Sequence, residues 1–268
     1  MNTLEKKMVE SLLDLRDNHH VLGVKAEFEA EGTRLEEAMR LKEVVTKAGL
    51  ELTIKIGGCE AVKDMYDARL IGTRIIVAPM IETPYAMKKY VKAVKFVFSE
   101  EERKNMKFLI NLETVTGFQN LEAITAEEDF KFIDGTVLGR VDLCRSLGYT
   151  REEINTEEIF SYALKLSEAM KAAGRDFVIG GGVSVYSMPF FRRLPYLTRF
   201  ETRKIIFDAP LMCADTHPEK GILKAVGFEL MWLENKRSLY HTIFEEDAQR
   251  MEMLERRYRK LIDEASRS

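Results

Sequence analysis

The sequence has few cysteines, and their spacing does not suit a metal site. Only Cys59, Cys144 and Cys213 occur in 268 residues, and an odd number argues against a framework of paired disulfides. We interpret them as reduced thiols that serve mainly in packing, which is typical of a cytoplasmic protein.

Long apolar runs and a strong charge of either sign are also missing. No stretch approaches the roughly 18 consecutive apolar residues that a membrane-spanning helix needs. The first residues lead into a charged amphipathic helix, which is not the pattern of a signal peptide. A net charge of −3 and a pI near 6.0 give no electrostatic case for a nucleic acid or an anionic membrane as partner.

Linkers rich in proline, glycine or serine, low-complexity tracts and clear internal repeats are absent as well. We therefore predict a single domain over residues 1–268. The chain has instead 46% hydrophobic and 32% charged residues, a composition that is ordinary for a globular protein with a substantial core.

Short apolar runs alternate with amphipathic helical patterns along most of the chain. This alternation is typical of parallel β/α units, and eight such units in a chain of this length favour a closed (β/α)8 TIM barrel. A Rossmann sheet is disfavoured because no Gly-x-Gly-x-x-Gly follows the first strand. The strand-like runs lie at 21–28, 51–56, 73–79, 94–98, 107–113, 133–139, 176–180 and 202–207, of which 94–98 is the weakest and could instead end a helix. The helical patterns between them lie at 34–48, 59–70, 84–93, 117–124 and 157–173.

Helices are expected at both ends of the barrel sequence. Residues 3–17 indicate an extra N-terminal helix, and 219–235 and 244–264 indicate two consecutive amphipathic helices, so about 219–268 forms a C-terminal helical extension. This extension is either a barrel-wall helix with a solvated cap or a helix that packs on a neighbouring subunit. We expect a homo-oligomer.

Two carboxylates are the most informative residues in this pattern. Glu113 ends the apolar run 108–112, and Asp142 follows the run 133–141. Catalytic groups of barrel enzymes gather at the carboxyl ends of the strands, so both side chains are expected at one mouth. Two convergent carboxylates suit a divalent cation such as Mg²⁺, with positions left open for substrate. The alternative for each acid is a helix N-cap or a surface charge.

Other charged residues are expected near the same mouth. Alternation along the first strand places Lys25, Glu27 and Glu29 on one face, and Lys55 lies near the end of the second strand. Glu27 or Glu29 could act as a general base. Lys55 could supply positive charge, or it could be held in a salt bridge to Glu27 or Glu29.

A glycine run follows the strand-like segment 176–180. Residues 180–182 are all glycine and Ser184 comes shortly after; loops at this place in many barrels bind phosphate through backbone amides. We predict that Gly182 and Ser184 bind substrate, with a tight turn as the alternative. A basic cluster downstream favours a polyanionic substrate if its members face the mouth: Arg192, Arg193, Arg199, Arg203 and Lys204.

Residues 77–86, 111–117 and 138–148 contain Glu82, Glu113 and Asp142. These three segments resemble the HpcH/HpaI aldolase and citrate lyase β-subunit family. Their order and spacing are similar to the family from about residue 21 to 148, and more loosely from 176 to 210. The resemblance implies a phosphoenolpyruvate/pyruvate-type barrel that makes or breaks carbon–carbon bonds next to a 2-oxo acid or an acyl thioester.

The resemblance also implies roles for individual residues. Glu113 and Asp142 would bind Mg²⁺, or another divalent cation such as Mn²⁺, which stabilises a pyruvate enolate. Backbone amides around Gly139, Arg140 and Val141 would hold the substrate carboxylate. The family usually has an arginine where this chain has Lys55, so Lys55 and Arg140 are expected to stabilise the enolate, although lysine lacks the planar fork of arginine.

One residue of the family is missing from this chain. The resemblance implies a base histidine in the loop after the first strand, where the sequence runs from Glu27 to Glu31 without one. His19 and His20 precede that strand and are expected at the opposite end of the barrel. His217 follows the last strand and is expected on the face of the mouth.

Together these features predict a metal-dependent carbon–carbon lyase, or aldolase, acting on a 2-oxo acid and a small anionic partner. Two alternatives stay open: a CoA-thioester lyase of the citrate or malyl-CoA type, and a catalytically idle barrel that serves as a ligand sensor or scaffold. A role of the helical tail in protein interaction is compatible with each of them.

Overall fold

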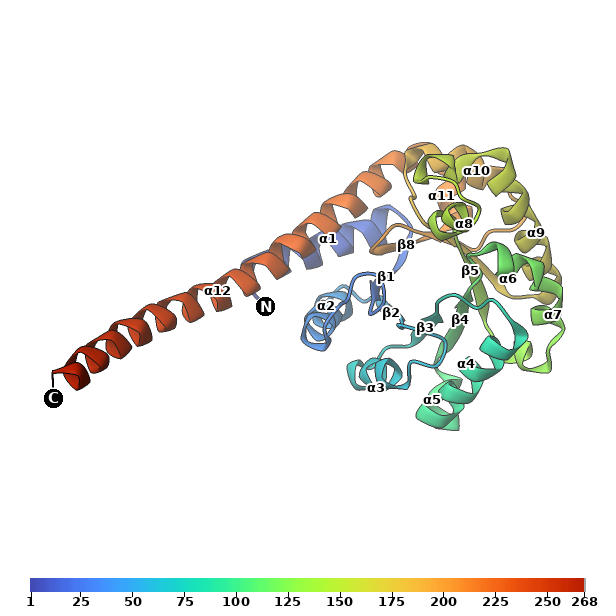
Figure 1. Ribbon diagram of the computed structural model, residues 1–268. Coiled ribbons are helices and arrows are strands. Elements are labelled where there is room, and N and C mark those ends of the chain that lie inside the picture. Colours follow the sequence, from blue (N-terminus) through green and yellow to red (C-terminus); the bar gives the residue numbers. More distant parts are fainter. Residues whose placement is uncertain (268) are drawn as a thin grey trace.

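Eight strands close into a barrel in the computed structural model, which describes residues 1–267. Figure 1 shows helices around this barrel and one long helix, α12, that leads away from it to the C-terminus. The strands are β1 (Val21–Glu27), β2 (Glu51–Lys55), β3 (Ile75–Ala78), β4 (Lys107–Asn111), β5 (Gly135–Gly139), β6 (Asp176–Gly180), β7 (Arg199–Glu201) and β8 (Ile205–Asp208). The predicted barrel, with helices at both ends of the chain, is confirmed.

Capping residues set the starts of several helices. The Asn2 side chain accepts the N–H of Glu5, and the Glu5 carboxylate accepts the N–H of Asn2, both at 2.8 Å, so the first helix begins with a capping box. The helices are α1 (Thr3–Asn18), α2 (Leu35–Lys47), α3 (Val62–Ile71), α4 (Pro84–Val97), α5 (Glu100–Lys104), α6 (Val115–Gln119), α7 (Leu121–Ala126), α8 (Arg140–Ser146), α9 (Glu157–Ala173), α10 (Met188–Arg192), α11 (Ala209–Ala214) and α12 (Pro218–Ser266). Short 3₁₀ helices are η1 (Glu128–Phe132), η2 (Arg151–Asn155) and η3 (Val185–Ser187).

The last strand departs from the expected parallel order. Strands β1 to β7 are parallel neighbours in sequence order, whereas β8 runs antiparallel to both β7 and β1. A turn at residues 202–204 joins β7 to β8, and the hydroxyl of Thr202 accepts the N–H of Ile205 at 3.1 Å. This turn therefore lies at the mouth, and the carboxyl end of β8 lies at the opposite end of the barrel.

The barrel interior changes from apolar to polar toward the mouth. Val77, Leu109, Val137 and Val178 form a separate buried cluster between the strands. Side chains of a strand face inward at every second position, so the inward residues beyond this cluster approach the mouth. These positions are charged, polar or glycine: Lys25, Lys55, Asn111, Gly139, Gly180 and Glu201. The fold thus places charged and polar side chains at the mouth, on one side of the apolar cluster, whereas Arg199 on the other side of it pairs with Asp176 at 3.0 Å.

Residues 94–97 end α4 and do not form a strand. Met87, Tyr90, Val91, Val94 and Val97 are buried and recur at three- and four-residue intervals, which is the spacing of one helix face. The strand expected at 94–98 is therefore wrong, and the short β7, which was not expected, makes up the eighth strand.

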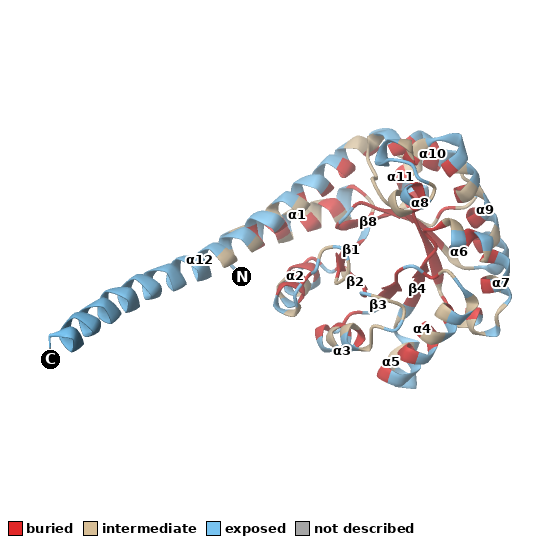
Figure 2. Cartoon of the chain, viewed as in Figure 1, coloured by how far each residue is buried: buried red, intermediate tan, exposed pale blue. Residues whose placement is uncertain are grey.

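The C-terminal extension is one continuous helix and not two. Helix α12 has 49 residues, or about 70 Å at about 1.5 Å per residue, and no proline or glycine interrupts it between 235 and 244. Its first part packs against α1, whereas every residue from His241 to Arg267 is exposed (Figure 2). Within residues 1–267 no helix combines the length and apolarity needed to cross a membrane.

Candidate functional site

Glu113 is a buried carboxylate at the carboxyl end of β4. It is 2% exposed; the N–H of Met80 donates to its Oε1 at 3.2 Å, and the side-chain amide of Asn111 donates to its Oε2 at 2.8 Å. Burial raises the pKa of Glu113, and the nearby charge of Asp142 raises it further, although the ammonium of Lys55 acts in the opposite direction. The carboxylate is therefore fixed in place but short of positive charge.

A glycine on the neighbouring strand leaves room for this carboxylate. A Cβ on Gly139 at the end of β5 would lie 2.1 Å from Oε2 of Glu113 and 3.0 Å from its Cβ. No side chain fits at that distance, so the position of Glu113 depends on the absence of one at residue 139.

Asp142 follows in the first turn of α8, and its side chain is 37% exposed. Within residues 1–267 no group of three or more histidine, cysteine or acidic side chains is arranged to hold a metal ion. Two carboxylates nevertheless fit Mg²⁺, which proteins commonly bind through one or two carboxylates with water and substrate as further ligands. The Oδ1 atom of Asn111, whose amide group holds Glu113, is buried without a hydrogen-bond partner among the described residues. The donor set thus suits an oxygen-binding divalent cation.

Lys55 lies next to Glu113 and forms the salt bridge to Glu29 that was expected as the alternative to a role in the site. Its Nζ lies 2.9 Å from Oε2 of Glu29 and 3.9 Å from Oε1 of Glu113. Burial alone would lower the pKa of Lys55, but the charge of Glu113 and the contact with Glu29 outweigh it and raise the pKa. Lys55 therefore stays an ammonium, and Glu29, with its side chain 30% exposed, is open to a ligand in the mouth.

Glu27 has a different partner. The ammonium of Lys25 contacts Glu27 at 2.9 Å and hydrogen-bonds Glu201, and all three side chains are buried. Burial alone would raise the pKa of Glu27, but the charge of Lys25 outweighs it and lowers the pKa. The side chain of Glu27 is 10% exposed and enclosed with Lys25, whereas that of Glu29 is 30% exposed, so Glu29 is the one of the two predicted bases that a ligand in the mouth can reach.

The structure corrects the expectation for Arg140. Its side chain is fully buried and does not point into the mouth. The guanidinium donates to the carbonyls of Gly180 and Gly181 at 3.3 and 3.0 Å, to Oδ1 of Asn155 at 2.7 Å and to Oγ of Ser187 at 3.2 Å. It also lies beside the rings of Phe190 and Phe191. Arg140 therefore holds the loop after β6 and cannot contact an enolate from this position.

The loops after β5 and β6 pack against each other. Gly181 has a φ of +79°, and a Cβ there would lie 2.8 Å from the backbone nitrogen of Val141; a Cβ on Gly182, with φ of +66°, would meet Ile154 at 2.6 Å. The structure thus brings Gly139, Val141 and Gly182 together, and the positive φ angles of Gly181 and Gly182 form the tight turn that was expected as the alternative to substrate binding. The N–H of Ser184 donates to Oγ of Ser187 at 3.3 Å, which gives Ser184 a local role in a turn.

The histidine expected on the mouth face lies at the other end. His217 follows β8, whose reversed direction carries the chain away from the mouth. The N–H of Asp208 at the end of β8 donates to the carbonyl of His20 at 2.9 Å, and Nε2 of His20 lies 4.0 Å from Asp215. His20 and His217 therefore belong to the same end of the barrel, and the expectation for His217 is wrong.

The basic cluster is divided in the same way. Three of its arginines have partners away from the mouth. Arg192 donates to the carbonyls of Cys213 and Asp215. Arg193 pairs with the carboxylate of Glu157, and Arg199 pairs with that of Asp176. Only Arg203 and Lys204, in the turn between β7 and β8, belong to the mouth.

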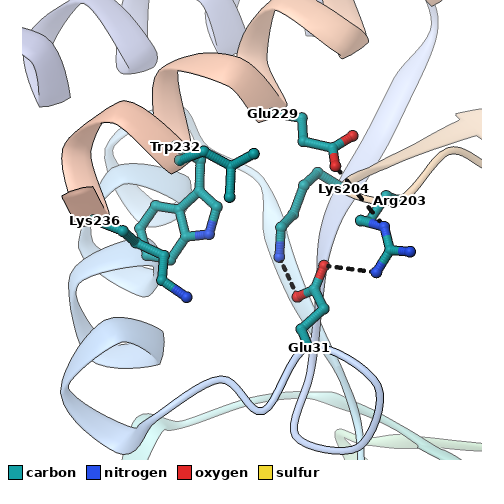
Figure 3. A pocket seen from close by; sticks show the side chains of 7 residues that line it. Glu31, Arg203, Lys204, Glu229, Trp232 and Lys236 are labelled. Atoms are coloured by element: carbon teal, nitrogen blue, oxygen red, sulfur yellow. Dashed lines mark hydrogen bonds and ion pairs between the residues drawn. The ribbon is translucent and has the colours of Figure 1, made fainter.

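A cavity of about 300 Å³ lies beside the mouth, between this turn and α12. In Figure 3 the ammonium of Lys204 points to one oxygen of Glu31, and Arg203 reaches the other oxygen and Glu229. Burial lowers the pKa of Lys204. The negative charge of Glu31 acts in the opposite direction but offsets this effect only in part. We call this cavity the rim pocket; its lining residues are Glu31, Arg203, Lys204, Glu229, Trp232, Leu233 and Lys236.

Two residues of the mouth were not predicted from the sequence: Glu201 pairs with Lys25, and Asn111 holds Glu113. Lys204, which was predicted as part of the basic cluster, pairs with Glu31. An inward-facing lysine on β1 requires a buried acid as partner, and this requirement is a signal from which an acid such as Glu201 could have been sought.

Comparisons with known proteins identify one matching family. A family model described as HpcH/HpaI aldolase/citrate lyase matches residues 27–181, a range that contains Glu29, Lys55, Glu113 and Asp142. No curated protein sequence matches the chain.

Solved structures with the same fold share little sequence with this chain. An HpcH/HpaI aldolase from Desulfitobacterium hafniense DCB-2 is 13% identical with a TM-score of 0.57, covering 73% of this chain and 82% of its own. An HpcH/HpaI aldolase/citrate lyase family protein from Burkholderia cenocepacia J2315 is 16% identical with a TM-score of 0.55, covering 72% and 92%. A citrate lyase from Burkholderia xenovorans LB400 is 15% identical with a TM-score of 0.55, covering 74% and 69%. At these identities the likeness concerns the fold alone.

Proposed function

The chain belongs to the HpcH/HpaI aldolase/citrate lyase family, and from this premise we propose that it is a divalent-metal-dependent carbon–carbon lyase that acts on a 2-oxo acid. The observation that carries the proposal is the environment of Glu113. This carboxylate is buried and fixed by two hydrogen bonds, it lies near a second acid, Asp142, and an ammonium lies 3.9 Å away. With a divalent cation held by the two acids, such a cluster would stabilise negative charge that develops on a substrate oxygen.

Glu113 and Asp142 would hold the cation, which supplies positive charge at the oxygen of a developing enolate. Lys55 adds a second positive charge on the side of Glu29. Since both carboxylates must be ionised to bind a cation, the raised pKa of Glu113 favours binding at neutral rather than acidic pH.

Glu29 would move the proton. In the direction of cleavage it takes the proton of the substrate hydroxyl, the carbon–carbon bond breaks to release an aldehyde, and the bonding electrons pass to the enolate of the 2-oxo acid. The same proton returned to the enolate carbon completes the 2-oxo acid product. Lys55, whose Nζ lies 2.9 Å from Oε2 of Glu29, holds this carboxylate in place.

Backbone amides would hold the substrate carboxylate. The backbone of Gly181 approaches the nitrogens of Arg140 and Val141, where a Cβ would lie at 2.9 and 2.8 Å. Any side chain at residue 181 would crowd these amides, so the glycine keeps them available to a small anion.

A matched pair of variants tests the role of Glu29. We expect Glu29→Gln to slow the exchange of the methyl protons of pyruvate for deuterium by about 10²-fold, since a general base typically contributes that much or more. Glu27→Gln, which alters a carboxylate already paired with Lys25, should leave the rate within about threefold, as expected for a residue outside the proton transfer. Proton NMR in heavy water with Mg²⁺ or Mn²⁺ follows the methyl signal. Equal losses in the two variants, or a loss in Glu27→Gln alone, would contradict the assignment of the base.

A further inference from the structure

The exposed face of α12 carries an apolar stripe with a seven-residue repeat. Its members lie alternately three and four residues apart from Leu223 to Leu261, and the mean spacing of about 3.5 residues is that of a coiled-coil seam. The apolar members that are at least 50% exposed are Leu223, Val226, Leu230, Leu233, Phe244, Met251, Leu254, Tyr258 and Leu261. We call these positions, together with Arg237, Tyr240 and Asp247, the seam.

The barrel of the same chain does not cover the seam. The opposite face of α12 is anchored, since the buried Asn235 bonds Asn2 and Glu5. Within the seam only the half-buried Tyr240 contacts the barrel, through a hydrogen bond from its hydroxyl to Glu37. Beyond Tyr240 every described residue is exposed, and the helix projects alone from the molecule (Figure 2). An apolar stripe of this length in water indicates a docking surface, and its sustained heptad period indicates a partner that is itself a helix with this period.

The two charged positions of the seam identify the partner and its direction. A parallel, in-register pair of α12 helices would place Arg237 against the partner's Arg237 and Asp247 against the partner's Asp247. An antiparallel pair whose twofold axis crosses both helices at Thr242 places Arg237 opposite the partner's Asp247, and the partner's Arg237 opposite Asp247. Neither charged residue has an ion-pair partner of its own among residues 1–267. Opposite charges within a seam select one register.

The same register pairs apolar residues everywhere else. A shift by one heptad in either direction would set Arg237 against the partner's Leu254 or the partner's Tyr240, which buries its charge unpaired. In the register centred on Thr242 the pairs are Leu223 with the partner's Leu261, Val226 with the partner's Tyr258, Leu230 with the partner's Leu254, Leu233 with the partner's Met251, and Tyr240 with the partner's Phe244. We infer that a second copy of this chain docks antiparallel along α12, so that each copy's tail covers the first half of the other's helix.

This exchange of tails brings the partner to the rim pocket. Glu229, Leu233 and Lys236 line the pocket from α12. Residues that flank the seam on the same side pair diagonally across the two helices. Glu229 therefore faces the partner's Arg257, which is an attractive pair. Lys236 faces the partner's Arg250 but is already bound to Glu37 at 2.9 Å. The partner's tail therefore passes along the outer side of the pocket.

Cysteine pairs test the register directly. We expect the double variant Leu230→Cys, Leu254→Cys to form a disulfide-linked dimer in high yield under mild oxidation, because these positions face each other across the two copies. Each single variant should stay monomeric on a non-reducing gel, which also controls for Cys59, Cys144 and Cys213. A Phe244→Cys, Leu254→Cys variant reports on a register centred nearer the C-terminus and should not cross-link. Cross-linking of Leu230→Cys alone, or of the third variant and not the first, overturns the arrangement.

A charge exchange tests the polar pair. Arg237→Asp places two carboxylates opposite each other, as Asp247→Arg places two guanidiniums, and each should weaken the dimer by about tenfold or more. The double variant Arg237→Asp, Asp247→Arg restores the pair and should recover the affinity, measured by sedimentation equilibrium. A double variant as weak as the single ones, or a wild-type chain whose mass is independent of residues 238–268, overturns the inference.

Discussion

Replacing Gly139 with alanine should lower the rate of methyl-proton exchange in pyruvate by about 10³-fold, because the new Cβ displaces the carboxylate that the site is built around. The added carbon would lie 2.1 Å from Oε2 of Glu113 and 3.0 Å from its Cβ. The side chain of Glu113 cannot move away from this carbon without losing the hydrogen bonds that it accepts from Met80 and Asn111. The measurement is the exchange rate in heavy water at saturating Mn²⁺.

Gly58 supplies the matched control. It follows β2 toward the same mouth, and a Cβ built on it meets nothing within 4 Å. Gly58→Ala should therefore exchange at the wild-type rate. Full activity of Gly139→Ala would mean that Glu113 can move without consequence, and the proposed role of this carboxylate would then be wrong.

Replacing Arg140 with methionine should destabilise the fold by about 3 kcal/mol, since it leaves buried carbonyls without a donor. The guanidinium serves the carbonyls of Gly180 and Gly181 together with Asn155 and Ser187. Methionine fills much of the volume next to the phenylalanine rings but offers no N–H. Urea denaturation should show a lower midpoint with an unchanged slope.

Arg145 is the control for this substitution. It lies on the same helix, α8, with 71% of its side chain exposed, so Arg145→Met should change stability by less than about 0.5 kcal/mol. If Arg140→Met kept wild-type stability but lost pyruvate exchange, Arg140 would act on the substrate, as the sequence analysis expected, and not on the loop.

The sequence was sufficient for the barrel because its apolar runs and helical patterns alternate over most of the chain. The departures occur where this signal is short or ambiguous. Strands β7 and β8 have only three and four residues, too few to display a period, and the turn between them contains neither glycine nor proline. Three of the residues 94–97 are apolar, which suits a strand as well as a helix, and only packing at helical spacing decides for α4.

The site was predictable as far as strand ends determine direction. Glu113, Lys55 and Glu29 meet at the mouth because alternation along a strand fixes which way a side chain points. Arg140 begins a helix, and there the motif alone does not fix the direction of the side chain. The guanidinium is directed by the buried carbonyls of Gly180 and Gly181, to which it donates. The predicted location of His217 was wrong for a topological reason, because the reversed strand β8 carries the chain after it to the other end of the barrel.

The most direct test of the proposed enolisation is exchange of the pyruvate methyl protons by the wild-type protein and by Glu113→Gln, each with Mn²⁺ and with a chelator. We expect exchange by the wild type only when the divalent cation is present, and none by Glu113→Gln under either condition. Exchange by Glu113→Gln at the wild-type rate, or no exchange by the wild type with any divalent cation, would contradict it and favour a barrel that binds its ligand without reaction.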